Sequence, residues 1–214
     1  MELAVKLGIP LENASLMYPS AVIYKCLIDM MGAEHIWIPG VHMTRGIAYE
    51  YAEQMKLLKG GHNFENDILM AAKNIGKRYA VNRPHVQNLE MTALAMFDAT
   101  KKMHGMKERE RLLLQMAVML HDVGKYISFN NVADSSYNII MSNEIIGLSH
   151  IEREMVALIA RYNTVTLPSY DELVMESSLS AEQYLTVSEL TAIVRLANAL
   201  DRSHLQKIRR SAPH

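Results

Sequence analysis

The chain has one cysteine, one tryptophan and three phenylalanines among its 214 residues. A single cysteine excludes a disulfide framework within the chain and favours a reducing compartment. Because Cys26 lies in an apolar stretch, we expect it to be a small buried side chain and not a nucleophile. Sixteen methionines accompany the few phenylalanines, and they predict a helical core of flexible, unbranched side chains.

An excess of charge of either sign is also missing. The 22 Lys and Arg residues nearly balance the 23 Asp and Glu residues, for a formal net charge of -1. This balance argues against a nucleic-acid-coating surface, although it is compatible with a local basic groove for a phosphate ligand. There is no signal-peptide pattern and no apolar run long enough to span a bilayer. We therefore expect a cytoplasmic protein without nucleic-acid or membrane partners.

The first fifty or so residues differ from the rest in pattern. Residues 19–31 predict a helix, with Pro19 at its start and Gly32 as its C-terminal stop. The apolar run at 35–38 is typical of a short buried strand, and a second helix is predicted at about 45–58. Because one strand is not stable alone, this segment is either completed by another chain or is a remnant of a larger domain.

After this segment, every stretch with clear periodicity is helical. Ser149 and Glu152 have the spacing of a capping box at the start of one helix. Half of the chain is hydrophobic and a fifth is charged, which is typical of a globular protein with a core. We predict a mainly α fold with a short α/β segment at the N-terminus, divided into residues 1–58 and 60–214. The predicted helices of the second part are 64–79, 84–104, 108–121, 135–142, 149–162 and 186–203.

A His-Asp pair, His121 and Asp122, ends an apolar helix and is followed by Val-Gly-Lys. Burying an acid beside a histidine costs free energy unless something compensates the charge, and a divalent cation does so directly. Gly124 ends the helix, so that Lys125 comes within reach of a phosphate bound to the ion. We predict a metal site with Asp122 and Lys125 as its catalytic residues.

Two further ligands are predicted on other helices. His85 follows Pro84 in the first turn of one helix, and Asp201 lies late in the last long helix, where a buried carboxylate needs a partner. Mixed imidazole and carboxylate ligands suit Mn, Fe, Zn or Mg. A His-Asp pair alone occurs often by chance, but this ordered set is more specific. We predict that four side chains converge on one ion: His85, His121, Asp122 and Asp201.

Candidate phosphate contacts lie beside the last of these ligands. His204 follows Asp201 by three positions and therefore shares its face of the helix. The alternative for His204 is a role in supporting the metal ligands. Arg202 is adjacent to Asp201, and its alternative is a solvated cationic helix end. Together with Lys125, we take Arg202 and His204 as substrate-binding candidates.

Four segments match, in order, the helical HD-type region of the exopolyphosphatase and guanosine pentaphosphate phosphatase family. They are residues 79–85 (Tyr-Ala-Val-Asn-Arg-Pro-His), 120–128 (Leu-His-Asp-Val-Gly-Lys-Tyr-Ile-Ser), 136–144 (Ser-Tyr-Asn-Ile-Ile-Met-Ser-Asn-Glu) and 200–204 (Leu-Asp-Arg-Ser-His). The resemblance implies an HD-type helical bundle over residues 60–214, with the same four metal positions. Residues 19–50 resemble the closing stretch of the actin-like phosphatase domain that precedes it in the family. Residues 1–58 would then be a remnant of that domain.

Three functions are compatible with this resemblance. In the first, the HD centre is a metal-dependent phosphohydrolase that acts on phosphoester or phosphoanhydride bonds, where Lys125 neutralises phosphate charge. In the second, the chain is a non-catalytic, regulatory and polyphosphate-binding part of an exopolyphosphatase. In the third, it is a scaffold that holds the parent enzyme as a homodimer. The expected ligand is polyphosphate or a small phosphate-containing molecule, and the actin-like machinery for polyphosphate hydrolysis is almost wholly absent.

Overall fold

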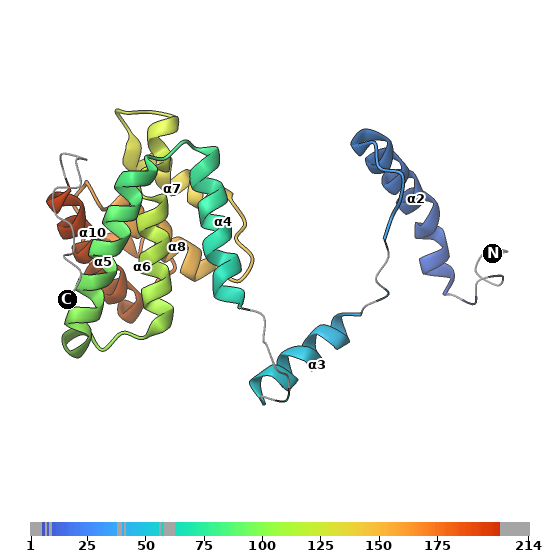
Figure 1. The fold of residues 1–214 in the computed structure, drawn as a ribbon, viewed down its shortest axis with the longest axis horizontal. Coiled ribbons are helices and arrows are strands. Elements are labelled where there is room, and N and C mark those ends of the chain that lie inside the picture. Colours follow the sequence, from blue (N-terminus) through green and yellow to red (C-terminus); the bar gives the residue numbers. More distant parts are fainter. Residues whose placement is uncertain are drawn as a thin grey trace, which may run out of the picture. The chain divides into compact units, whose positions relative to one another are not determined.

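A computed structural model of the protein describes residues 6, 8, 10–37, 40, 42–55, 57 and 63–201. The chain divides into two compact units, Met1–Gly61 and His62–His214, called here the N-terminal unit and the helical unit. The regular secondary structure over the described ranges is entirely helical, which confirms the predicted mainly α fold (Figure 1). The domain assignment of the N-terminal unit to an actin-like remnant stays a prediction.

The N-terminal unit contains α2 (Leu11–Met31) and α3 (Met43–Gln54). Helix α2 ends at Gly32, whose left-handed φ of +62° suits glycine, and the amide of Ala33 donates to the carbonyl of Ile28. The predicted stop is therefore confirmed, but the predicted start is wrong. Pro19 lies inside α2, which begins eight residues earlier.

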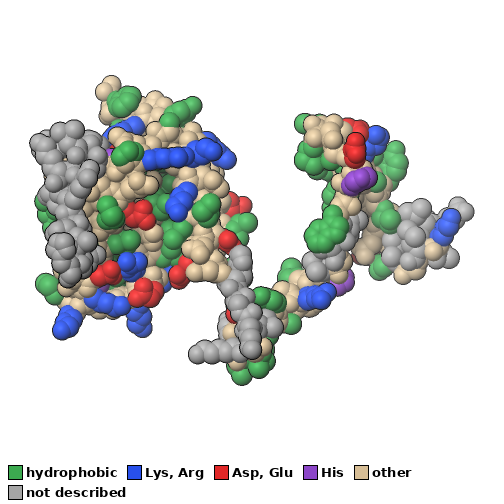
Figure 2. Space-filling model, in the orientation of Figure 1, with side chains coloured by type: hydrophobic (Ala, Val, Ile, Leu, Met, Phe, Trp, Pro, Cys, Tyr) green, Lys and Arg blue, Asp and Glu red, His purple; other side chains and the backbone are tan. Residues whose placement is uncertain are grey.

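Two further predictions for the N-terminal unit are also wrong. Residues 35–37, predicted as a strand, have no regular secondary structure, and residue 38 lies outside the described residues. The reason is that a lone strand has no neighbour with which to pair its backbone. Cys26 is exposed and not buried, because no residue of α2 is buried. Figure 2 shows hydrophobic side chains at the surface along α2.

The helical unit is built around α6, which contacts four other helices, α4, α5, α8 and α10. Every residue of α6 from Leu112 to Leu120 is buried except Gln115, as expected of a helix that is surrounded on all sides. Its elements are α4 (Phe64–Arg78), α5 (Arg83–His104), α6 (Glu108–Leu120), the 3-10 turn η1 (Val123–Tyr126), α7 (Val132–Ser142), α8 (His150–Arg161), α9 (Tyr170–Leu173) and α10 (Ala181–Leu200).

Most of these helices agree with the predicted ranges, and the largest difference is at α10. This helix begins at Ala181 and not at residue 186, because Ser180 and Gln183 form a capping box at its start. The short helix α9 lies between the predicted helices 149–162 and 186–203, where no helix was predicted. No helix in the described part of the chain is long and apolar enough to cross a membrane.

An ion pair joins the start of α6 to the start of α8. Arg109 Nε donates to Glu152 Oε1 at 2.6 Å, and Arg109 Nη2 donates to Glu152 Oε2 at 2.9 Å and to the carbonyl of Gly147 at 2.7 Å. The Ser149 amide also donates to Glu152 Oε2, which completes the predicted capping box. The hydrogen bond from Arg109, more than any other contact, lowers the pKa of Glu152 to about 2.

We predict that Glu152→Gln lowers the free energy of unfolding at pH 7 by about 1–3 kcal/mol, because charged hydrogen bonds of this kind are lost. Since the pKa of Glu152 in the folded state is depressed from 4.5 to about 2, its contribution is present above pH 4.5. It is lost as the pH falls from 4.5 towards 2. Urea unfolding of both proteins across this range measures the difference. Glu182→Gln, an exposed residue in the first turn of α10, is the control and should change stability by less than about 0.5 kcal/mol.

Candidate metal centre

The His-Asp pair lies where the most buried helix of the unit ends. His121 holds the C-cap position of α6 with helical dihedral angles, and Asp122 then leaves the helix and precedes η1. His121 is 2% exposed and Asp122 is 8% exposed. Both polar side chains are therefore placed in the interior by the apolar helix that carries them.

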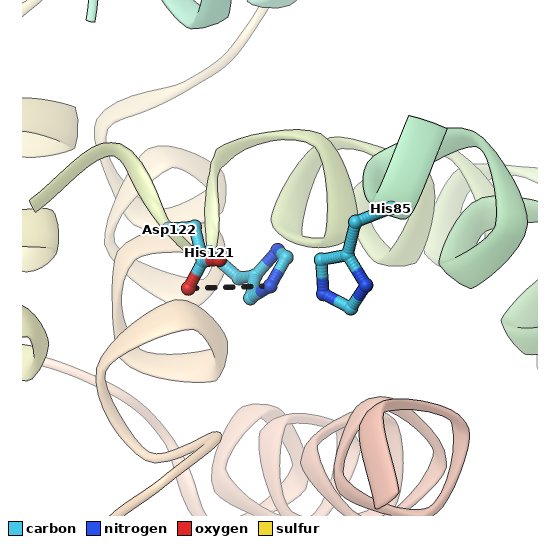
Figure 3. Close-up of side chains that lie close together, drawn as sticks. All are labelled: His85, His121 and Asp122. Atoms are coloured by element: carbon cyan, nitrogen blue, oxygen red, sulfur yellow. Dashed lines mark ion pairs between the residues drawn. The ribbon is translucent and has the colours of Figure 1, made fainter. Parts of the chain in front are cut away.

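Three of the four predicted ligands come together in space. One donor atom from each of His85, His121 and Asp122 lies within 4.8 Å of the other two. His85 comes from the first turn of α5, where Asn82 caps the helix by accepting a hydrogen bond from the His85 amide at 3.2 Å. The two imidazole rings lie side by side with centroids 5.5 Å apart, and Asp122 lies beside His121 (Figure 3).

Asp201, the fourth predicted ligand, contacts His85 of this group. It holds the C-cap position of α10 and is buried, and its Oδ2 lies 2.8 Å from His85 Nδ1. It is not one of the three residues whose donor atoms lie within 4.8 Å of each other. A carboxylate on one imidazole nitrogen fixes the ring orientation and directs the other nitrogen towards a metal, as around many protein metal sites.

The backbone fixes the tautomer of the neutral His121 ring. Its Nδ1 lies 2.7 Å from the carbonyl of Val118 and must donate to it, so Nε2 carries the lone pair. Burial lowers the pKa of His121, which keeps the ring neutral at pH 7. Among the described residues Nε2 has no hydrogen-bond partner, and it faces Asp122 Oδ1 at 3.4 Å. A lone pair buried beside a carboxylate fits a cation better than it fits an apolar core.

The two oxygens of Asp122 have different surroundings. Oδ1 faces His121, whereas Oδ2 accepts a hydrogen bond from Lys125 Nζ at 2.5 Å. Burial opposes ionisation, but the hydrogen bond and the positive charge of Lys125 favour the ionised form, and the pKa of Asp122 lies below its usual value. Asp122 is therefore an ionised carboxylate with one oxygen on the histidine side.

A serine from α7 holds the turn that carries these residues. The fully buried hydroxyl of Ser136 donates to the carbonyl of His121 at 3.0 Å and accepts from the amide of Gly124 at 2.9 Å. A Cβ on Gly124 would lie 2.3 Å from the carbonyl oxygen of Val132 and 2.6 Å from the Ser136 nitrogen. Sequence reasoning explained Gly124 only as a helix stop and missed Ser136. The available signal was a serine three and four positions before Ile139 and Ile140, on the buried face of α7.

Two pockets meet at Asp122 and Lys125, and both also include Phe129. The amide-rich pocket has a volume of about 660 Å³, and the aromatic pocket has a volume of about 460 Å³. Apart from the three shared residues, the amide-rich pocket is lined by Asn130, Asn131, Val132, Ala133, Asn163, Thr164, Val165, Arg195, Asn198 and Ala199. The aromatic pocket is otherwise lined by Tyr79, Ala80, Val81, Asn82 and Tyr126.

Of the three substrate-binding candidates, only Lys125 can be placed. Arg202 and His204 lie outside the described residues. The sequence did not predict Arg195 or the asparagines as lining residues, because isolated arginine and asparagine residues carry no distinctive pattern.

The chain is similar to one protein family in two comparisons with known proteins. The family model for Ppx/GppA phosphatase, domain III, matches residues 69–213. A guanosine-5'-triphosphate,3'-diphosphate pyrophosphatase from Vibrio atlanticus (strain LGP32) is 20% identical over 190 residues. That alignment covers 87% of this chain but 36% of the relative, so the chain spans about a third of the relative's length.

We predict that the serine bridge stabilises the turn measurably. Ser136→Ala should lower the free energy of unfolding by about 1–3 kcal/mol, because it leaves the buried Gly124 amide without its acceptor. Gly124→Ala should cost about 1–3 kcal/mol or more, since the added methyl group meets backbone atoms that cannot move aside. Ser135→Ala, the neighbouring half-buried serine, is the matched control for urea unfolding. An equal loss in Ser135→Ala and Ser136→Ala would contradict the role of the bridge.

Proposed function

We propose, from the premise that this chain belongs to the Ppx/GppA phosphatase family, that its helical unit is an HD-type, metal-dependent phosphohydrolase region. It would hydrolyse phosphoanhydride or phosphoester bonds. The observation that supports this most directly is the buried convergence of two imidazoles and a carboxylate, beside a lysine that lines both pockets. Such a group is costly in a core unless a cation neutralises it.

The residues that would hold the ion are His85, His121 and Asp122, with Asp201 as the fourth predicted ligand or as the partner that orients His85. The donor set suits Mn, Fe, Zn or Mg. When bound, a divalent ion polarises a phosphoryl oxygen and makes water more acidic. The tautomer of His121 suits this role because its Nε2 lone pair is directed at the centre and its Nδ1 is held by Val118.

The charged groups of the chain would bind and orient the substrate. Lys125 Nζ, already beside Asp122 at the junction of both pockets, would bind a phosphoryl oxygen and neutralise its charge. The ionised Asp122 would accept a hydrogen bond from the attacking water and orient it. Arg195 lines the amide-rich pocket and supplies a second cation there. Arg202 and His204 stay predicted phosphate contacts.

A second candidate function is a non-catalytic polyphosphate-binding, regulatory or dimerisation module of such an enzyme. The observation that favours it is that the alignment covers only 36% of the relative, which is named as a pyrophosphatase. The activity in that name need not reside in the matching part. Metal content and turnover by this chain distinguish the two candidates.

We expect the purified chain to bind about one divalent ion with the three grouped residues as ligands. His121→Ala should abolish binding, and Asp201→Asn should weaken it about 10–100-fold, which is typical of lost support for a ligating histidine. Calorimetric titration with Mn²⁺ and elemental analysis measure this. His150→Ala, an exposed histidine on α8, is the control and should bind as the wild type does. Unchanged Mn²⁺ affinity in His121→Ala would refute the proposed site.

We also expect slow hydrolysis of small phosphate compounds when Mn²⁺ or Mg²⁺ is added, but no processive release of phosphate from long-chain polyphosphate. Asp122→Ala should reduce the rate at least about 100-fold, because it removes both a ligand and the group that orients water. Asp171→Ala, an exposed aspartate on α9, should leave the rate unchanged. Polyphosphate hydrolysis that survives Asp122→Ala would mean that the chemistry is assigned to the wrong residues.

A further inference from the structure

A third pocket lies between α4 and α5 and has a volume of about 340 Å³. Both helices pack against α6, which runs between them in Figure 1, and Met119 of α6 lines the pocket. We call it the basic groove, after Lys73, Lys77 and Arg83, which also line it. Among its described lining residues, it shares only Val81 with the two pockets at the His-Asp turn. The basic groove is therefore separate from the proposed metal centre.

The floor of the basic groove is apolar. Ala72, Val86 and Met119 line it and are buried, so they belong to the core on which α4 and α5 pack. Val81, from the loop that joins the two helices, is half-buried beside them. An apolar side chain of a ligand can therefore be removed from water on this floor, and that removal favours binding.

Three cations lie beside this floor. Lys73 and Lys77 are exposed and lie one turn apart on α4, and Arg83 is exposed at the start of α5. None of the three forms an ion pair with another residue in the described ranges. Glu90, the carboxylate that lines the groove, already accepts a hydrogen bond from Gln115 at 2.6 Å. Figure 2 shows Lys and Arg side chains gathered near the end of α4. This uncompensated positive charge favours an acidic partner.

Two kinds of polyanion suit such a charge, and the apolar floor distinguishes them. A polyphosphate or nucleic-acid chain carries a charge on every unit and would place charged groups over an apolar surface, where they lose hydration. A peptide can combine acidic and apolar side chains, so that its carboxylates reach the cations while an apolar side chain reaches the floor. Asn74 and Gln87 are exposed and also line the groove, and each amide can donate to and accept from a peptide backbone.

We propose that the basic groove is a docking site for an acidic peptide segment of a partner protein, with one apolar anchor side chain between its acidic residues. The anchor contacts Val86 and Met119, and the flanking carboxylates pair with Lys73, Lys77 and Arg83. The volume of about 340 Å³ is near the lower end of the range of roughly 300–1,000 Å³ for ligand pockets, which suits a single anchor. The inference is independent of the proposed hydrolysis, because none of the proposed metal ligands lines the groove.

The probe for this site is the acetylated and amidated peptide Asp-Glu-Phe-Glu-Asp, titrated into the full chain with isotope-labelled Val and Met methyl groups. We expect saturable shifts of the Val86 and Met119 methyl resonances, because the ring of the anchor lies against them. Replacing the anchor with glycine should weaken binding at least about tenfold, since the apolar contact is lost. Raising NaCl from about 0.05 M to about 0.5 M should also weaken binding, because salt screens exposed charges.

Lys73→Glu and Lys77→Glu should each weaken binding of the peptide at least about fivefold, because each change places a negative charge beside its carboxylates. Lys102→Glu is the matched control, since it makes the same change at an exposed lysine on α5 that does not line the groove. It should bind the peptide as the wild type does. All three lysines are exposed, so their replacement removes no core packing.

Four results would overturn the docking site. The first is that the peptide does not bind, and the second is equal affinity for the phenylalanine and glycine peptides, which would reveal an unspecific anion surface. The third is methyl shifts confined to residues outside the groove, because the peptide would then bind elsewhere. The fourth is tighter binding of long-chain polyphosphate than of the peptide, lost in Lys73→Glu, which would assign the groove to a polyanion. Each of these results leaves the Mn²⁺ titration of the proposed metal centre as a separate test.

Discussion

The burial of His121 and Asp122 at the end of α6 is the constraint on which the site depends. An apolar helix surrounded by four others places both side chains where water cannot solvate them, so each polar atom needs a partner within the protein. The Val118 carbonyl binds one nitrogen of His121, and Lys125 binds one oxygen of Asp122. The atoms that face each other, His121 Nε2 and Asp122 Oδ1, are those that the proposed ion would join.

The site is assembled from the ends of three helices. The N-terminus of α5 supplies His85, the C-terminus of α6 supplies His121 and Asp122, and the C-terminus of α10 supplies Asp201. Helix ends are where backbone groups lack helical partners and are satisfied by side chains or ligands instead. Because α5 packs against both α6 and α10, the apolar core sets the spacing of these ends. The packing of α5 against α6 and α10 therefore contributes both to stability and to the geometry of the site.

The sequence was sufficient for most helices of the helical unit, because their apolar periodicity and caps are local signals, but it missed α9 and placed the start of α10 five residues too late. It also predicted the grouping of His85, His121 and Asp122, because the ordered set of a histidine, a His-Asp pair and a late helical aspartate is more specific than a His-Asp pair alone. It failed for the strand at residues 35–37, which depends on neighbours that a local pattern cannot supply. Ser136 and the pocket linings also depend on which helices meet, and no local signal of adequate strength marks them.

Lys125 determines which oxygen of Asp122 is left for the proposed ion. It pairs with Asp122 Oδ2, whereas Oδ1 faces the histidines, so an ion and the lysine can share one carboxylate without competing for the same oxygen. An arriving phosphate would then meet both the proposed ion and Lys125 beside Asp122. Ser136 fixes the backbone from His121 to Gly124, because its hydroxyl donates to the His121 carbonyl and accepts from the Gly124 amide. The four residues from His121 to Gly124 therefore connect the proposed ligands to Lys125, which lines both pockets.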